Sequence, residues 1–529
     1  MRARTVGAAL GAVLVAALGA TSLTSCGSEP EAVRIVSAGQ LVSLDPTATV
    51  DATSRGLMAQ LYPLLLQRDA RTGVLETSLA DSAEFTAPDE YTVTIPSGLE
   101  FANGDTLTSS DVVFSFQRML ELGVESGPGA QLEGVRSVEA TDEQTVVFHL
   151  ATANDASFPS ALASPAGVIV DEEVFAADAT TSDEVIVDAQ PFAGPFRVGE
   201  VTSATAMTLV ANPHWVGEPP GAATIELELG VDPEEAAHRL MDGSADVVWG
   251  TLPNAVRESL ADASGVRVIS RPSRSLRMLV FDLATMPFGA ATDQADAAKA
   301  AAVRRAVADL VDRDALAEAA PGQWIGWAGF LPETLGGSAD PIATTTGDGT
   351  GGPSASDATS VLAAAGVTTP VPLTFSVGLR DGEGGPDALT EALVAQLETG
   401  GLFDVTIAPH DGPFTKAVLT ENHFPAFEFR WSPLGNDPDD YLTALYGPES
   451  ELANNAVSAD LNAALAAEAT LTDPDERAAA ILEIQQTLAQ RLTTIPLVQR
   501  LDSAFVGPRI TGGAISGRGH LDFASLLLT

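Results

Sequence analysis

Residues 91–116 read YTVTIPSGLEFANGDTLTSSDVVFSF, and this stretch decides the fold. Apolar and polar residues alternate from Tyr91 to Ile95, which predicts a half-buried strand. Asn103-Gly104 is a polar turn signal, and Thr108-Ser-Ser-Asp111 is typical of a capping box that opens a helix. Apolar residues then recur at helical spacing, at Val112, Val113, Phe116, Met119 and Leu120. The stretch therefore predicts a strand, a turn and an amphipathic helix.

Both kinds of pattern recur along the chain. Thr145–Leu150, Leu373–Val377 and Asp404–Ile407 predict strands. Three helices are predicted from apolar stripes: Val303, Val307 and Leu310; Leu389, Leu393 and Leu397; and Ile481, Ile484, Leu488 and Leu492 after an Asp473-Pro474 start. Strands that alternate with helices predict an α/β or mixed fold. Glu333–Ser360 is rich in Gly, Ser, Thr and Asp and is predicted to be a long surface loop.

The composition excludes several classes of function. The formal net charge is -44 for 529 residues, and a charge of that sign repels nucleic acid and anionic lipid head groups. The six histidines are scattered and there is one cysteine, so we expect no zinc site, no other metal site and no disulfide. Gly-x-Ser-x-Gly and Gly-Lys of a phosphate-binding loop are both missing from the sequence. We therefore predict no cofactor and no catalytic residues.

The N-terminal segment predicts export. Arg2 and Arg4 precede an uncharged apolar run from Val6 to Ala20, which is too short to span a bilayer and is typical of a signal peptide. Leu23-Thr-Ser-Cys26 resembles a bacterial lipobox, whose cysteine is diacylated and becomes the mature N-terminus. We predict a signal peptide over 1–25, lipidation of Cys26, and a tether over 26–31. The alternatives are an incidental cysteine after an ordinary signal peptide, and an uncleaved signal anchor.

The 91–116 stretch resembles the signature of the large solute-binding proteins of ABC importers, the oligopeptide-, dipeptide- and nickel-binding family. That signature is an alternating strand, Gly-x-x-Phe, Asn/Asp-Gly, Leu-Thr, and Asp-Val-Val-Phe-Ser. Further segments match in the family's order: Leu44-Asp45-Pro46, Gly194-Pro-Phe-Arg-Val198, Asn212-Pro-His-Trp215, Ala245-Asp-Val247, Val303-Arg-Arg-Ala306 with Asp312-Arg313, Leu362–Gly366, Trp431 with the Asp-Pro-Asp that follows it, and Ile495-Pro-Leu497. The resemblance covers residues 33–505.

The resemblance implies a bilobed periplasmic-binding-protein type II fold with an extra inserted domain. Domain I would comprise residues 32–50, 190–272 and 499–529, domain II the insertion 51–189, and domain III residues 273–498. The ligand would be enclosed between domains I and III by a hinge motion. The implied function is a lipid-anchored receptor on the outer face of the membrane, a monomer that delivers peptides or related solutes to an ABC permease. A sensory receptor of the same fold, or a secreted hydrolase that uses two carboxylates, remains an alternative.

The resemblance also points to ligand-binding residues. Phe427-Glu-Phe-Arg-Trp431-Ser432 resembles the family's strand that enters the cleft, so Trp431 is expected to stack on the ligand. Arg430 and Ser432 are candidates for polar contacts, with Arg430 suited to a carboxylate. Trp249 is a candidate for the opposite wall. The alternative is that Phe427, Phe429 and Trp431 fill a core while Glu428 and Arg430 face solvent, and that Trp249 is ordinary core.

One position departs from the family's pattern. Peptide-binding relatives carry an acid three residues after this tryptophan, where it pairs with the ligand's amino terminus, and here that residue is Leu434. Asp437 is the candidate substitute if the loop shifts; otherwise Asp437, Asp439 and Asp440 are interpreted as a solvated acidic turn. Because a buried ammonium without a partner is costly, peptides with a free amine are disfavoured as ligands.

Overall fold

The computed structural model describes most of the chain after residue 31. The described residues are 32–49, 51–69, 71–122, 127–320, 322–378, 387–410, 424–517 and 519–529. Cys26, the leader before it and the tether after it lie outside these ranges. Residues 32–529 form one compact unit. Across the described ranges, no helix combines the length and the apolar character that crossing a membrane requires.

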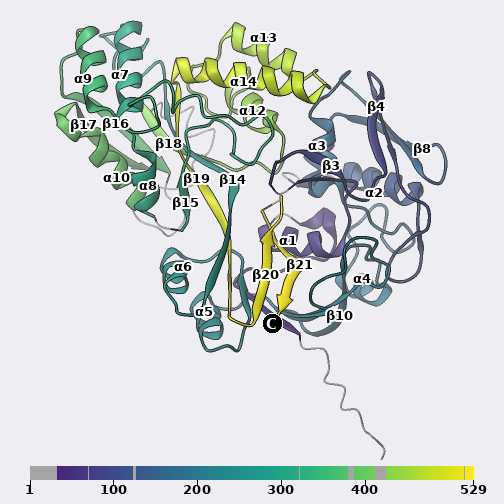
Figure 1. Cartoon of the computed structure of the whole chain (residues 1–529). Coiled ribbons are helices and arrows are strands. Elements are labelled where there is room, and N and C mark those ends of the chain that lie inside the picture. The colour runs from purple at the N-terminus through teal and green to yellow at the C-terminus, as the bar shows by residue number, and fades with distance from the viewer. Residues whose placement is uncertain are drawn as a thin grey trace, which may run out of the picture. The chain divides into compact units, whose positions relative to one another are not determined.

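Helices and strands both occur throughout this unit (Figure 1). The helices are α1 Ala52–Leu61, α2 Ser109–Leu122, α3 Phe158–Leu162, α4 Asp183–Ala189, α5 Pro233–Met241, α6 Asn254–Ala261, α7 Ala297–Leu310, α8 Arg313–Glu318, α9 Ala355–Ala364, α10 Ala388–Leu397, α12 Leu442–Tyr446, α13 Ala459–Glu468 and α14 Pro474–Arg491. The strands are β1 Val33–Ser37, β2 Leu66–Arg68, β3 Leu75–Thr77, β4 Ser82–Ala87, β5 Glu90–Thr94, β6 Leu99–Glu100, β7 Thr106–Leu107, β8 Val135–Ala140, β9 Thr145–Leu150, β10 Phe196–Ser203, β11 Ala206–Ala211, β12 Thr224–Glu228, β13 Val247–Trp249, β14 Arg267–Phe281, β15 Trp324–Gly326, β16 Val371–Gly378, β17 Phe403–His410, β18 Ala426–Trp431, β19 Thr494–Val506, β20 Ile510–Ile515 and β21 Leu521–Leu528.

The decisive stretch forms the predicted strand, turn and helix. β5 lies inside a four-stranded antiparallel sheet in the order β4-β5-β9-β8. At the start of α2, Thr108 N–H donates to Asp111 Oδ2 at 2.8 Å, and Ser110 N–H donates to Thr108 Oγ1 at 3.2 Å. The cap satisfies backbone groups that have no partner within the helix, so the helix begins where the sequence predicted.

The largest sheet within the described residues has 11 strands. Its order is β10-β11-β12-β1-β13-β19-β14-β18-β16-β17, and β15 also pairs with β19. β1 and β13 are parallel, with Ser37 opposite Trp249, so the carboxyl ends of both strands lie at the same edge. In open α/β sheets that edge is where ligands bind.

Two long strands run side by side through this sheet, as Figure 1 shows. β14 and β19 pair antiparallel from Arg267 opposite Val506 to Val280 opposite Thr494. The register shifts between Pro272 and Leu276, and there the buried Gln499 side chain donates to Ser273 O at 2.6 Å. The ladder is therefore interrupted at 272–276, and Gln499 satisfies a backbone oxygen that lacks a strand partner.

Buried apolar residues form separate clusters along the chain. One cluster comes from residues 65–169 with Ala193 and includes Tyr91, Phe116 and Phe148. A second comes from residues 276–498. A third combines residues 33–64, 168–269 and 504–526, and includes Leu57 and Phe175. A smaller fourth cluster surrounds α5 and α6. Apolar burial of this extent stabilises each cluster by removing apolar surface from water.

The prediction for Glu333–Ser360 is wrong in part. α9 begins at Ala355, where Ser354 Oγ accepts from Asp357 N–H at 3.3 Å, so the last residues of the segment are helical. Ile342 is fully buried and Leu335 is 4% exposed. The Gln485 side chain also donates to Gly337 O at 2.8 Å. Buried apolar residues and hydrogen bonds to Gln485 and Asp309 together hold this loop on the 276–498 cluster, although its apolar residues show no regular period.

Candidate functional site

Strand β18 carries the predicted ligand-binding aromatic. The Trp431 ring stacks on the Phe429 ring with centroids 6.0 Å apart, and Trp431 Nε1 donates to Asp440 O at 2.7 Å. Trp431 is half-buried, whereas Arg430 and Ser432 are exposed. The alternative interpretation of this strand is wrong for Glu428, which is 4% exposed and accepts from Arg277 Nε at 2.6 Å. The two faces of β18 are thus an aromatic face and a face with a buried ion pair.

Asp437 is held in a buried ion pair. Arg477 donates to both of its oxygens, at 2.6 Å to Oδ1 and 2.9 Å to Oδ2, and Ser160 Oγ donates to Oδ2 at 2.6 Å. Burial opposes ionisation of Asp437, but the Arg477 guanidinium, the Ser160 hydroxyl and the Arg68 charge together outweigh it and hold the pKa of that carboxyl below its usual range. Asp437 is only 3% exposed, so the interpretation as a solvated acidic turn is wrong.

Arg477 also binds a second buried acid. Its Nε donates to Glu468 Oε1 at 2.6 Å, and its Nη1 donates to Ala156 O at 2.8 Å. Burial of Glu468, together with the Asp439 charge, raises the pKa of Glu468 to about 7 although Arg477 acts in the opposite direction. These contacts join α14 and the loop after β18 to residues 156–160. The network therefore links these segments, and the carboxylates of Asp437 and Glu468 already bind Arg477.

The backbone at Leu434 is bound by an arginine, and the Asp440 carboxylate lies against the next residue, Gly435. Arg274 Nη1 donates to Leu434 O and to Gly435 O, both at 2.9 Å. The Tyr441 hydroxyl in turn donates to Arg274 O at 2.6 Å, which ties this loop to β14 from both sides. The backbone of the loop that follows Trp431 is therefore held by the guanidinium of Arg274.

Trp249 lies at the end of β13 and is only 5% exposed. Its ring meets the Phe523 ring edge-on, with centroids 5.3 Å apart. A Cβ added to Gly56 of α1 would lie 2.3 Å from Trp249 Cζ2, so α1 can approach only because residue 56 has no side chain. Trp249 nonetheless borders a cavity of about 80 Å³ and is both a core residue and a wall residue.

That cavity is lined by charged residues that the sequence patterns did not indicate. Arg257, Arg500, Asp502 and His520 border it together with Trp249. Arg271 lies opposite Asp502 in the β14–β19 ladder. Burial raises the pKa of Asp502 to about 6, although Arg500, Arg274, Arg257 and Arg271 all act to lower it. We call these four arginines, all of which act on Asp502, the arginine cluster.

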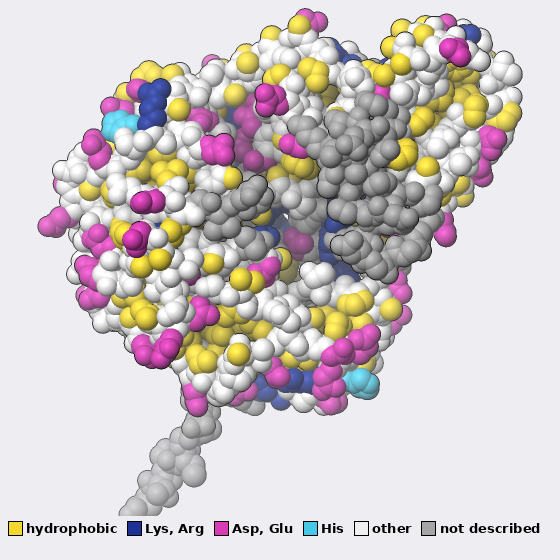
Figure 2. Space-filling view, turned by 180° about the vertical axis from the view of Figure 1, so that it is seen from behind, with side chains coloured by type: hydrophobic (Ala, Val, Ile, Leu, Met, Phe, Trp, Pro, Cys, Tyr) yellow, Lys and Arg dark blue, Asp and Glu magenta, His cyan; other side chains and the backbone are white. Residues whose placement is uncertain are grey.

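Figure 2 shows Lys and Arg side chains on the wall of a hollow near the middle of one face of the molecule. The members of the arginine cluster are up to 243 positions apart, from residue 257 to residue 500, and no motif connects them in the sequence. The only hint of this cluster in the sequence is the composition: just 27 residues of the chain are Lys or Arg, so each basic residue is uncommon. The cavity lining includes Trp249 but none of the predicted residues between 430 and 437.

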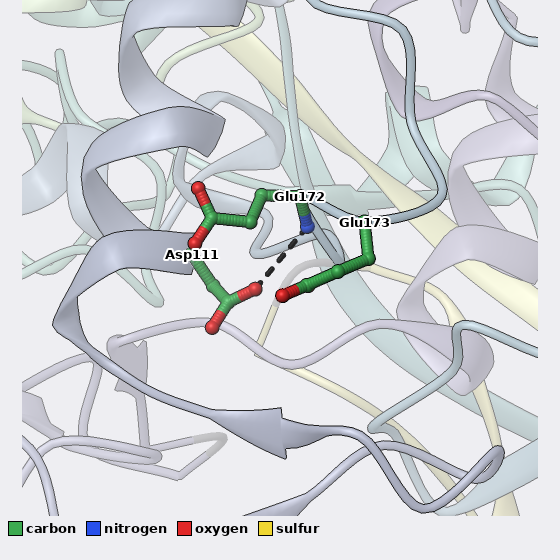
Figure 3. Close-up of side chains that lie close together, drawn as sticks. All are labelled: Asp111, Glu172 and Glu173. Carbon is green, nitrogen blue, oxygen red and sulfur yellow. Dashed lines mark hydrogen bonds between the residues drawn. The ribbon is translucent and has the colours of Figure 1, made fainter.

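A group of acids lies apart from this cavity, at the start of α2 (Figure 3). Asp111, Glu172 and Glu173 bring carboxylate oxygens within 4.8 Å of one another. Both oxygens of Asp111 accept backbone N–H groups, from Thr108 at 2.8 Å and from Glu172 at 3.2 Å. Burial raises the pKa of Asp111 to about 6. Helix capping accounts for the buried member of this group, and we assign no metal to it.

Known proteins resemble this chain over 47% to 90% of its length. Heme-binding protein A of Haemophilus influenzae is 24% identical over 510 residues, which cover 90% of this chain and 89% of that protein. A probable D,D-dipeptide-binding periplasmic protein of Escherichia coli is 26% identical over 262 residues. The match spans 47% of this chain and 49% of that relative, about half of each.

Solved structures agree in fold. The unliganded open form of a periplasmic murein tripeptide binding protein superposes with a TM-score of 0.80 at 18% identity, over 95% of this chain and 98% of that one. HbpA2 from Haemophilus parasuis superposes with a TM-score of 0.78 at 19% identity, over 94% of this chain and 100% of that one. The α/β class and the periplasmic-binding-protein type II fold are thus confirmed. The model of the bacterial extracellular solute-binding proteins, family 5, matches residues 74–451, and the chain belongs to this family.

Proposed function

We propose that the chain is a lipid-anchored receptor that captures a peptide or a related small solute outside the cell and delivers it to the permease of an ABC importer. The family match over residues 74–451 carries this proposal. The signal-like leader that ends at Cys26 supports export and a single lipid anchor. Relatives named for binding dipeptides and a neighbour solved with the peptide STSA support a peptide-like solute.

We propose that the solute lies between two lobes that close around it. Domain I would contain 32–50, 190–272 and 499–529, and domain III would contain 273–498. The interrupted ladder at 272–276 supports a hinge there, since few strand hydrogen bonds oppose bending. Leu57 and Phe175 pack with the core of domain I, so the independent core of the inserted domain would run from about residue 65 to 169.

We propose that Trp431 forms one wall of the ligand site, with Arg430 and Ser432 exposed beside it and Trp249 on the opposite side. Asp437 takes no part in ligand binding in this proposal, because Arg477 and Ser160 already occupy both of its oxygens. Leu434 itself offers no carboxylate for a peptide's amino terminus. Binding requires no covalent step, because closure follows from a difference in affinity between the open and closed states.

Calorimetric titration tests solute capture. A panel of peptides, oligosaccharides and metal chelates should contain a solute that binds the full-length chain and reduces its radius of gyration in X-ray scattering. Trp431→Ala should weaken that binding at least tenfold, about 1.4 kcal/mol, since stacking area is lost.

Trp327→Ala is the matched control, because Trp327 is also half-buried and its Nε1 donates to a backbone oxygen, Leu331 O, at the same 2.7 Å. Affinity that is unchanged in Trp431→Ala would refute the role of this tryptophan. A chain that neither binds nor closes with any member of the panel would refute the receptor itself.

Membrane anchoring has its own test. Cys26→Ser should move the protein from the membrane fraction to the soluble fraction or the medium, because no thiol remains for acylation. Ser28→Ala is the control and should stay with the membranes. Retention of Cys26→Ser in the membrane fraction would show that something other than a lipid at Cys26 holds the chain there.

A further inference from the structure

The core of the inserted domain and the 276–498 cluster are separate apolar units. Within the described residues, the partly buried apolar side chains that pack on the 276–498 cluster come from positions 283–453 and not from the 65–169 core. By contrast, Ala102 and Phe114 of the inserted segment pack on the third cluster, which belongs to the proposed domain I. Domains move relative to one another unless a large hydrophobic interface joins them. The inserted core is therefore expected to move with domain I and to separate from the 276–498 cluster.

Polar contacts cross the boundary between these two units. Ser160 Oγ donates to Asp437 Oδ2 at 2.6 Å. Arg477 Nη1 donates to Ala156 O at 2.8 Å, and Ala156 N–H donates to Ala469 O at 3.0 Å. We call these three hydrogen bonds the interdomain contact. They join the segment between β9 and α3, and α3 itself, to the loop after β18, the end of α13 and the start of α14.

Both sides of the interdomain contact keep charged partners of their own. Arg477 donates to both oxygens of Asp437, at 2.6 Å and 2.9 Å, and both residues belong to the 276–498 side. On the inserted side, Ser160 Oγ accepts from Arg68 Nη2 at 2.6 Å, and Arg68 Nη1 donates to Gly73 O at 2.8 Å. Separating an ion pair is costly when a charge is left without a partner. The interdomain contact can therefore break while Asp437 stays paired.

Arg68 also places a cation opposite Asp437 across the boundary. Its Nη2 lies 3.9 Å from Asp437 Oδ2, and its side chain is only 7% exposed. The Arg68 charge contributes to holding the pKa of Asp437 below its usual range, so the two groups attract each other. This attraction acts only while the two units touch. Complementary charges of this kind fix the register in which two surfaces meet.

We propose that Ser160 and Arg68 are positioning residues of solute capture, which hold the inserted domain against residues 276–498 while the lobes are closed and release it when they open. The inference rests on the proposed closure of the lobes and gives the inserted domain a part in it. Because the contact is polar and breaks without an unpaired anion at Asp437, it biases an equilibrium between two arrangements and does not lock one of them.

Hydrogen–deuterium exchange of the full-length chain, measured without solute, tests the proposal at the amide of Ala156. Ser160→Ala should accelerate exchange there roughly tenfold or more, because a hydrogen bond to a charged acceptor is lost and the boundary opens more often. Exchange in the paired strands β5 and β9, inside the inserted core, should stay unchanged. Arg68→Gln should accelerate exchange at Ala156 about threefold or more, since a cation facing Asp437 is removed, and it serves as the test if Ser160→Ala fails to fold.

Ser115→Ala is the matched control. Ser115 is 4% exposed and Ser160 is 3% exposed, so the two hydroxyl groups are equally buried. The Ser115 hydroxyl donates within α2 at 2.7 Å and accepts from Val170 N–H at 2.8 Å, so these bonds stay on one side of the boundary. Exchange at Ala156 should be unchanged in this variant.

Three results would overturn the proposal. The first is unchanged exchange at Ala156 in folded Ser160→Ala. The second is equal acceleration in β5 and β9, which would mean that Ser160 supports the fold of the inserted domain itself. The third is the same selective acceleration in Ser115→Ala. Because the exchange measurement uses no solute, the positioning role can fail while the receptor function stands, and failure of the whole calorimetric panel would refute the receptor by a separate measurement.

Discussion

Arg118→Met should lower the free energy of unfolding by about 3–5 kcal/mol, because it removes one member of a buried ion pair and leaves the other charged. Arg118 is 2% exposed and donates to both oxygens of the fully buried Asp45, at 2.9 Å and 2.5 Å. It also donates to Ala176 O at 2.6 Å and to Ala179 O at 2.9 Å. Urea denaturation at neutral pH measures the loss.

Two variants make the Arg118 result interpretable. Arg239→Met removes an ion pair in which Glu228 is 44% exposed, and it should cost at most about 1 kcal/mol. Asp45→Asn combined with Arg118→Met should recover part of the loss, since no uncompensated charge then remains buried. A loss below about 1 kcal/mol in Arg118→Met would mean that Asp45 is solvated or protonated without its arginine.

Arg477→Met is expected to have an effect of similar size, about 3–5 kcal/mol, for a related reason. The change leaves two buried acids, Asp437 and Glu468, without their common partner. It also removes the bond to Ala156 O, which joins α14 to the inserted domain. Arg136→Met is the control, because its exposed side chain makes only a surface hydrogen bond to Ala151 O at 3.0 Å. Thermal and urea unfolding measure both.

The loss in Arg477→Met should depend on pH. In the unmodified chain the pKa of Asp437 is lowered, so its stabilising contribution is present above its unfolded pKa and is lost as pH falls. Without Arg477, burial raises the pKa of both acids in the folded state, and the folded variant binds protons that the unfolded chain releases. The difference in the free energy of unfolding between the unmodified chain and Arg477→Met should narrow as pH falls from about 7 towards about 4, which is close to the pKa of Asp and Glu in an unfolded chain. A difference independent of pH would exclude charge as its origin.

Local patterns were enough to predict many elements. α2, β5, β9 and α14 begin within a residue or two of the predicted positions, because capping and apolar periodicity act over neighbouring residues. The same patterns failed for Glu333–Ser360, where Leu335 and Ile342 are buried without any periodicity and Gln485 also binds the loop backbone.

The predicted ligand residues show where local reasoning ends. Trp431 could be selected because it belongs to a segment that resembles the family, and Trp249 because it follows one. The state of Asp437 could not be predicted, since it depends on Arg477, 40 positions away, and on Ser160, 277 positions away. The contact between Leu434 and Arg274 could not be predicted either, because Arg274 lies on another strand, 160 positions away in the sequence.

The sequence by itself determined the family, the α/β class, most helices and strands, and the expectation of an exported chain tethered at Cys26, because each depends on residues close together in the chain. Only the tertiary structure decided which acids are engaged in ion pairs and which arginines share a cavity. Pairing of β14 with β19 places Arg271 opposite Asp502, and Arg257 and Arg500 border the same cavity from distant parts of the chain, because charges act through space and not along the sequence.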